Sequence, residues 1–187
     1  MNIDEYKKQL EILTEKYPKK YRGTKYIINW DYHWEEKKKI IDLADLSGVK
    51  TALDIGTGMG ILAYQLQQRG IDVEATDIDV DTTGHLFKEA TNLINLPVHY
   101  LKILPKKPID LQKKYDIVFS TRTEFDRQDG FCWELFLNDC FKHTSQIVIK
   151  TNRGNKTNPF PQRLHRYSIK DATWIICLKK QEFFSED

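Results

Sequence analysis

The sequence predicts an α/β protein built on a doubly wound, mostly parallel sheet, and two observations support this. From residue 49 onward, short apolar strands alternate with helical segments, an order that gives parallel strands joined by right-handed crossovers. Near the C-terminus, apolar segments 165–169 and 173–180 are separated only by Lys-Asp-Ala, which is too short for a crossover helix. We therefore expect these two strands to close the sheet as an antiparallel hairpin.

The elements of this core can be placed by their patterns. We expect helices at 61–69, 82–95 and 132–143. With the hairpin, the sheet would be of a seven-stranded type, and its other strands are expected at 51–56, 71–78, 98–103, 116–121 and 146–151.

Residues 1–47 are expected to form a helical extension. Apolar side chains recur three or four residues apart in the first segment, which predicts a helix that Pro18 stops. A second helix is expected from about Trp34 to Leu46, after an aromatic cluster around His33. We expect one domain, with 1–47 as a cap over a core at 48–187.

Composition excludes several classes of protein. The 187 residues carry a net charge of +2, which argues against a strongly basic nucleic-acid binder and an acidic disordered tail. No apolar run approaches the roughly 20 residues of a membrane span, and the charged N-terminus has no secretory pattern. The three cysteines, Cys132, Cys140 and Cys177, are expected to be reduced, two of them buried, in a cytoplasmic protein.

The most informative stretch is ALDIGTGMG at residues 52–60, followed by Asp77 at the end of the next strand. In a doubly wound sheet, ligands bind at the carboxyl ends of the strands, beside the point where the strand order reverses. Glycines after the first strand let the backbone approach a ligand closely. An acid that ends the second strand can accept hydrogen bonds from both ribose hydroxyls. Together these features predict an adenosine-type cofactor site.

The spacing argues against two common phosphate-binding patterns. Counted from Gly56, the sixth position of a dinucleotide fingerprint is Ile61 instead of glycine or alanine, and the Gly-Lys-Ser/Thr ending of a P-loop is absent. Asp54, two residues before the first glycine, would repel a pyrophosphate but suits a cationic ligand. S-adenosylmethionine has a sulfonium and an ammonium group and no phosphate, so it fits this pattern.

At these residues the sequence resembles the class I S-adenosylmethionine-dependent methyltransferases, which have a Rossmann-like fold. LDIGTGMG matches their first motif and Asp77 their second, and the strand order agrees over about residues 50–180. The resemblance implies S-adenosylmethionine as cofactor and S-adenosylhomocysteine as product. It implies that Asp54 lies near the methionine end, that Asp77 holds the ribose and that Ile78 packs on adenine. The other cofactor-binding residues it implies are Gly56, Thr57, Gly58, Met59, Gly60, Ser120 and Thr121.

One departure from the family concerns adenine. Many members place an acid after the third strand, whereas residues 101–105 read LKILP here. Backbone and apolar contacts, with Ile103 as a wall, are expected instead.

Residues 120–127 (STRTEFDR) are expected at the reacting centre, where the protein positions the acceptor and takes a proton from a hydroxyl. Glu124 or Asp126 is a candidate general base, and Arg122 or Arg127 is a candidate ligand for a carboxylate or phosphate. The alternative is a solvated loop whose charges pair with one another. His33 is a second candidate base, because N-terminal extensions in the family often fold over the site as a lid.

Two features favour oxygen on a small-molecule or glycan-like acceptor. The N/D-P-P-Y/F tetrapeptide of amino-directed DNA and protein-glutamine methyltransferases is absent. A narrower similarity links the chain to bacterial class I methyltransferases of uncertain substrate, some of them associated with glycan or small-metabolite modification. It rests on Phe125, Trp133, Phe136, Leu137 and Asn152. No metal is expected, because the strand at 146–151 does not end in carboxylates.

Two alternatives stay open. An RNA or protein methyltransferase would need a basic rim with aromatic side chains beside it. The candidate cations for such a rim are Lys19, Lys20, Arg22, Lys25, Arg153, Lys156, Arg163 and Arg166. A net charge of +2 favours scattered, solvated charge instead. The second alternative is a non-catalytic subunit that only binds S-adenosylmethionine, which the polar groups at 122–126 disfavour.

Overall fold

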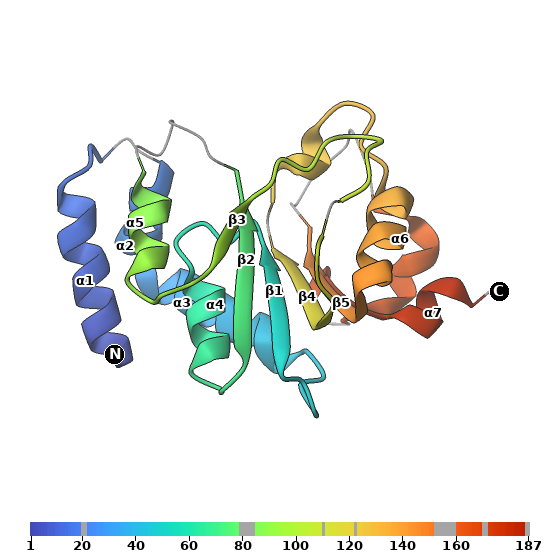
Figure 1. The fold of residues 1–187 in the computed structure, drawn as a ribbon, viewed down its shortest axis with the longest axis horizontal. Helices are drawn as coiled ribbons and strands as arrows, with labels where there is room; N and C mark the ends of the chain where they lie inside the picture. The colour runs from blue at the N-terminus through green and yellow to red at the C-terminus, as the bar shows by residue number, and fades with distance from the viewer. Residues whose placement is uncertain are drawn as a thin grey trace.

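A computed structural model of the chain shows one twisted sheet with helices on both faces (Figure 1). The structure describes residues 1–19, 22–78, 85–109, 111–121, 123–151, 160–169 and 172–185. In these ranges seven strands form the sheet: β1 (Thr51–Ile55), β2 (Asp72–Asp77), β3 (Val98–Tyr100), β4 (Tyr115–Thr121), β5 (Thr144–Lys150), β6 (Ser168–Ile169) and β7 (Ala172–Lys179).

The strand order is β3-β2-β1-β4-β5-β7-β6. The first five strands in this order pair in parallel, whereas β7 pairs antiparallel with both β5 and β6. The predicted fold class is therefore confirmed, including the C-terminal hairpin. The order reverses between β1 and β4, which is where a doubly wound sheet opens a crevice for a ligand.

The helices follow the predicted alternation, with shifted boundaries. The α-helices are α1 (Ile3–Glu15), α2 (Lys25–Ile28), α3 (Trp30–Asp42), α4 (Ile61–Gln67), α5 (Leu86–Asn92), α6 (Trp133–His143) and α7 (Lys180–Phe184). Short 3₁₀ turns are η1 (Arg22–Thr24), η3 (Phe125–Arg127) and η4 (Gln162–Tyr167). The sequence did not predict α2 or α7.

The second predicted helix was misplaced. It was expected over 34–46, but α3 begins at Trp30 and ends at Asp42. Of the aromatic cluster, Tyr26 lies on α2, whereas Trp30, Tyr32 and Trp34 lie on α3, where Trp30 and His33 are buried on the same face as Ile40 and Ile41. His33 therefore has a fixed place on a helix and does not belong to a preceding loop.

Alternation along the strands divides the core into two layers. Ala52 of β1 packs with α1, α3, α4 and α5, whereas its neighbour Leu53 packs with α6 and α7 on the opposite face. The same alternation places Asp54 on the α3 side and Ile55 on the α6 side. Figure 1 shows α1–α5 gathered around β1–β3, with α6 and α7 beyond β4 and β5.

The N-terminal helix packs directly against the core. Tyr6 is fully buried, stacks on Tyr64 with ring centroids 4.3 Å apart, and donates a hydrogen bond of 2.8 Å to the Met59 carbonyl. At the other end of α1, the Tyr17 hydroxyl donates to Glu89 on α5 at 2.5 Å. The extension is thus tied to the loop that follows β1.

The cysteines differ in part from the expectation. All three are free thiols, but only Cys140 is buried, Cys177 is half-buried and Cys132 is exposed. Cys132 lies just before α6, outside the inward face of that helix. No helix in the described ranges has both the length and the apolar character needed to cross a membrane.

Candidate active site

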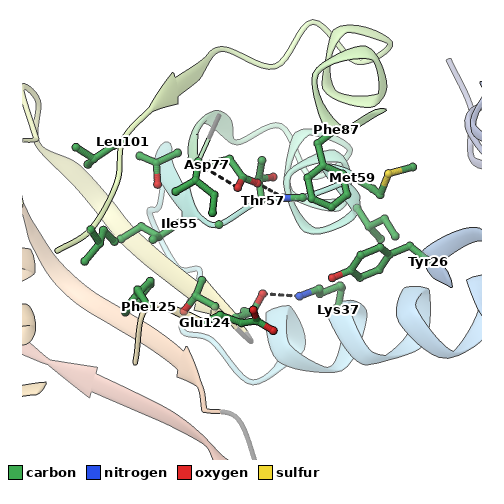
Figure 2. Close-up of a pocket in the computed structure, with 18 of the residues that line it drawn as sticks. Tyr26, Lys37, Ile55, Thr57, Met59, Asp77, Phe87, Leu101, Glu124 and Phe125 are labelled. Atoms are coloured by element: carbon green, nitrogen blue, oxygen red, sulfur yellow. Dashed lines mark hydrogen bonds between the residues drawn. The ribbon is translucent and has the colours of Figure 1, made fainter. Parts of the chain in front are cut away.

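A cavity of about 520 Å³ lies at the carboxyl edge of the sheet, next to the reversal between β1 and β4 (Figure 2). Its walls come from the loop after β1, the ends of β2 and β3, and the segment after β4. Helices α2, α3 and α5 add side chains from the other side, including Tyr26, Lys37 and Phe87. This volume is in the range of small-ligand pockets.

The glycines after β1 shape the cavity floor. Gly56, Gly58 and Gly60 have φ angles of +74°, +56° and +80°, which glycine adopts with little strain. The N–H groups of Gly56 and Thr57 both donate to the Thr76 carbonyl, at 2.8 and 3.2 Å, and so hold the loop against β2. A Cβ added to Gly56 would lie 2.4 Å from the Thr123 methyl group.

Asp77 holds the same loop from the end of β2. One carboxylate oxygen accepts from the Gly58 N–H and the other from the Ile78 N–H, both at 2.7 Å. Because Asp77 also lines the cavity, its oxygens lie where a ligand's hydroxyl groups can reach them. The ribose role expected for Asp77 stays a prediction that this position supports.

Asp54 is a buried carboxylate near the end of β1. It is 1% exposed, and neither of its oxygens has a hydrogen-bond partner within the described part of the chain. Burial raises the pKa of Asp54 to about 6, while the nearby Lys37 ammonium and then the Thr57 hydroxyl act in the opposite direction. A cationic ligand beside this carboxylate would compensate its burial. The site therefore suits a ligand with a sulfonium and an ammonium group.

An apolar end of the cavity lies beside β3. Ile78 is 45% exposed and borders it together with Leu101, Ile103 and Phe125. The Gln128 side chain donates to the Ile103 carbonyl at 3.0 Å and so fixes this wall. This end of the cavity is apolar, and its role as a wall for adenine stays a prediction.

Helix α3 closes the opposite end. His33, Glu36 and Lys37 are three or four residues apart and all line the cavity. The Lys37 ammonium donates to the Thr121 hydroxyl at the end of β4. Glu36 forms an ion pair of 2.9 Å with Lys150 at the end of β5, and these side chains are 7% and 16% exposed. Two adjacent residues of α3 thus bind the carboxyl ends of two adjacent strands.

The structure brings most predicted residues to the cavity, but three lie behind its surface. Lining residues among those predicted are His33, Gly56, Thr57, Gly58, Met59, Asp77, Ile78, Ile103, Thr121 and Glu124. Asp54 lies beneath the loop. Gly60 precedes α4 and faces Ile94, and Ser120 points to the opposite sheet face from Thr121. Arg122 lies outside the described residues.

The charged loop after β4 is partly self-paired. Glu124 and Arg127 both line the cavity and form an ion pair of 3.8 Å with half-exposed side chains. Asp126 is buried and does not line the cavity. The loop is therefore partly a set of charges that pair with one another, and it also presents the Glu124 carboxylate and the Arg127 guanidinium to the cavity.

The residues of the narrower resemblance serve mainly the core. Trp133 and Phe136 pack edge to face with centroids 5.8 Å apart, and Leu137 is fully buried. Phe125 contacts Phe136 and also reaches the cavity. Asn152 lies outside the described residues.

Only part of the proposed basic rim reaches the cavity. Lys25 lines it, together with Lys102 and Arg127, which the rim did not include. Arg163 instead pairs with Glu134 at 2.7 Å. Lys20, Arg153 and Lys156, and the side chains of Arg22 and Arg166, lie outside what the structure describes. In the described ranges no group of three His, Cys, Asp or Glu residues is placed to hold a metal.

Sequence reasoning missed Glu36, Lys37, Tyr26 and Phe87. Glu36 and Lys37 lie in the run EEKKK at 35–39, which has the composition of a solvated helix face. The signal that would have found Lys37 is its spacing, four residues after His33 and three before Ile40. That spacing places Lys37 on the buried stripe of α3.

The chain is similar in sequence to two curated methyltransferases. The chain is 28% identical over 131 residues to a tRNA1(Val) (adenine(37)-N6)-methyltransferase of Flavobacteriaceae bacterium strain 3519-10, with 64% of this chain and 55% of the relative covered. An enzyme of the same name from Trichodesmium erythraeum strain IMS101 is 32% identical over 90 residues, with 44% and 37% covered. The chain thus spans about half or less of these curated relatives. No family model matches it.

A solved structure shows the same architecture. A candidate RNA methyltransferase from Pyrococcus horikoshii matches with a TM-score of 0.51 and 16% identity, covering 71% of this chain and 64% of that one. The chain has the class I methyltransferase fold. The resemblance to class I S-adenosylmethionine-dependent methyltransferases is confirmed. In this methyltransferase fold the crevice between β1 and β4 coincides with the cavity described above.

We predict that Gly56→Ala destabilises the protein more than Gly48→Ala. Both glycines have positive φ, at +74° and +72°, but no atom lies within 4 Å of a Cβ at Gly48. Both variants should lose about 1–2 kcal/mol from backbone strain, and only Gly56→Ala adds the contact with Thr123. Urea denaturation measures the difference. Adding Thr123→Ser, which removes the methyl group, should recover stability in Gly56→Ala, and equal losses at both glycines would contradict the assignment.

We predict that Asp54→Asn raises the stability of the cofactor-free protein at neutral pH. The folded-state pKa of about 6 lies above the ordinary value of 3.8, so folded Asp54 keeps a proton that unfolded Asp54 has lost. Stability therefore falls as pH rises from about 4 to 6, by about 3 kcal/mol in total, and the neutral amide removes this loss.

Urea denaturation at pH 5 and pH 7.5 measures this effect. Asp116→Asn is the control of opposite sign, because the backbone N–H groups of Lys50 and Thr51 lower the pKa of Asp116. It should destabilise the protein at pH 7.5. A wild-type pH slope that persists in Asp54→Asn would show that another group causes it.

Proposed function

We propose that this chain transfers a methyl group from S-adenosylmethionine to oxygen on a small-molecule or glycan-like acceptor. The observation that carries the cofactor assignment is the buried carboxylate of Asp54 at the β1–β4 crevice, whose oxygens have no hydrogen-bond partner in the described ranges. Such a carboxylate favours a ligand whose charge is positive. The methyltransferase names of the relatives support the same assignment.

Each end of the cavity has a role in this proposal. Asp77 would accept hydrogen bonds from the ribose hydroxyls, and the apolar walls at Ile78 and Ile103 would hold adenine. Asp54 would compensate the positive charge of the methionine end, close to the glycine loop. The cofactor, when bound, supplies an activated methyl group with a good leaving group, so the protein has mainly to position the acceptor.

The small acceptor is supported by the way α2 and α3 border the cavity. Tyr26, His33 and Lys37 close it from the N-terminal side, which fits the proposed role of residues 1–47 as a cap. The missing N/D-P-P-Y/F tetrapeptide disfavours an amino group on a base. For a hydroxyl acceptor, His33 and Glu124 are the groups placed to take a proton. A cytoplasmic location is part of the same proposal.

RNA is the second candidate acceptor, and two observations favour it. Both curated relatives are named as tRNA methyltransferases. Lys25, Lys102 and Arg127 have exposed side chains that border the cavity, where they could contact phosphates. A nucleotide would then have to enter the cavity flipped out of its strand.

Asp77→Ala should weaken S-adenosylhomocysteine binding at least about tenfold, because charge-assisted hydrogen bonds to the ribose are lost. Isothermal titration calorimetry measures the affinity, and circular dichroism checks the fold. Asp72→Ala is the matched control, because Asp72 is exposed at the opposite end of β2. Unchanged affinity in Asp77→Ala would remove Asp77 from the ribose site.

Transfer of label from S-adenosyl-[methyl-³H]methionine tests the acceptor. The purified protein is incubated separately with RNA, polysaccharide and small-molecule fractions of the source cells. We expect label in the small-molecule or polysaccharide fraction. Label confined to RNA would favour the second candidate. Binding of S-adenosylhomocysteine without transfer to any fraction would favour the non-catalytic subunit.

A further inference from the structure

We propose that Phe87 binds the cofactor beside Asp77, and that the N-terminal extension holds Phe87 in place through Gly23. The inference rests on the proposed function, because it assigns a binding residue and a positioning residue to the proposed cofactor site. It is carried by the contacts of the Phe87 ring, which come from three separate segments of the chain.

The Phe87 ring lies between two glycines that are far apart in the sequence. A Cβ added to Gly23 would lie 3.0 Å from the ring atom Cε1, and a Cβ added to Gly58 would lie 3.9 Å from Cζ. Tyr26 of α2 also contacts the ring edge to face, with centroids 6.3 Å apart. Figure 2 shows the ring beside the loop after β1, in the wall of the cavity. Phe87 is only half-buried, so its ring packs on the core and still lines the cavity.

Gly23 is needed for a close approach and not for its backbone angles. Its φ lies outside the left-handed region in which other residues are strained. A Cβ at this position would lie 2.5 Å from Leu86 Cδ2, in the same turn of α5 as Phe87. Leu86 is fully buried, so it has little room to move away. The missing side chain of Gly23 therefore sets how closely η1 approaches α5, and with it the position of Phe87.

Two hydrogen bonds fix this part of the extension. Just after α1, the Tyr17 hydroxyl donates to Glu89 of α5 at 2.5 Å. The Thr24 hydroxyl donates to the Lys19 carbonyl at 2.8 Å, which joins η1 to the residues that follow α1. The position of Gly23 against α5 thus depends on the folded extension.

Phe87 lies beside the proposed ribose position. Gly58, which is next to the ring, donates its N–H to Asp77 at 2.7 Å. A ribose whose hydroxyls are bound by Asp77 would therefore have the Phe87 ring next to it. An apolar ring there excludes water from the hydrogen bonds between the hydroxyls and the carboxylate, and such bonds are stronger in a medium of low dielectric constant. The ring also adds apolar contact with the sugar carbons.

Substitutions at Phe87 test the binding role. Phe87→Ala should weaken S-adenosylhomocysteine binding about tenfold, because contact area and shielding from water are both lost. Phe87→Leu keeps an apolar side chain on α5 but lacks the ring that reaches toward Gly58, so it should weaken binding about threefold. This second variant protects the test if Phe87→Ala folds poorly.

Calorimetry on the full chain measures the dissociation constants. Lys88→Ala is the matched control, because Lys88 is the next residue of α5 and is exposed, and it should leave the affinity unchanged. Wild-type affinity in Phe87→Leu would overturn the binding role, whatever the behaviour of Phe87→Ala.

5′-Methylthioadenosine shows which part of the cofactor Phe87 contacts. This ligand keeps the adenosine of the cofactor but lacks its amino-acid part. Because the ring is proposed to lie beside the ribose, Phe87→Leu should weaken both ligands by the same factor. If only S-adenosylhomocysteine binding is weakened, Phe87 contacts the amino-acid part and the position beside Asp77 is wrong.

A double-mutant cycle tests whether Gly23 acts through Phe87. Gly23→Ala should weaken S-adenosylhomocysteine binding about threefold, because the added methyl group displaces Leu86 and Phe87. In the Phe87→Leu background the same substitution should hardly change the affinity, since the ring is no longer there. A structural role alone would lower the urea stability in both backgrounds without this difference in affinity. Equal losses of affinity in both backgrounds, or no loss in either, would overturn the role of Gly23.

Failure of the proposed function gives a different result. If the wild-type chain binds neither S-adenosylmethionine, S-adenosylhomocysteine nor 5′-methylthioadenosine, the cofactor site itself is wrong, and the role of Phe87 is overturned with it. If the wild-type chain binds these ligands and the Phe87 variants bind them equally well, only the assignment of Phe87 is wrong.

Discussion

The attachment of α3 to the carboxyl edge of the sheet determines the character of this site. Glu36 pairs with Lys150 on β5, and the adjacent Lys37 donates to Thr121 on β4. Helix α3 therefore cannot shift along the sheet without breaking two polar contacts in a largely buried region, where unpaired charges are costly. This fixed helix sets the wall opposite the glycine loop.

The glycine loop and Asp77 at one end of the cavity could be predicted from the sequence because their determinants are local. The glycines at 56, 58 and 60 follow a buried strand directly, and Asp77 ends the next strand, so spacing alone brings them to one edge. The alternation of strands and helices could also be predicted from the sequence, and so could the hairpin near the C-terminus. Ser120 does not line the cavity although its neighbour Thr121 does, because a one-residue step along a strand reverses the face that a side chain occupies.

The wall formed by α3 could not be predicted in the same way, because it depends on a helix packed from far away in the sequence. Lys37 lies 84 residues from Thr121, and nothing in the run EEKKK distinguishes the inward lysine from its exposed neighbours. Lys37 is identified as the inward lysine only by its helical spacing from His33 and Ile40. A helix predicted to start at Trp34 leaves out His33, so this spacing was not recognised. The sequence also could not show whether Glu124 faces the cavity or only pairs with Arg127, and the structure shows that it does both.

The burial of Asp54 links the stability of the folded protein to the binding of a cationic ligand. A buried carboxylate without hydrogen bonds lowers the stability of the empty protein, whereas a cationic cofactor that binds only the folded state raises it by mass action. The fraction of unfolded chains, and with it their exposure to proteases, then rises when the cofactor pool shrinks. On the proposed function, the abundance of this protein follows the methyl-donor supply of the cell, with no separate sensor needed.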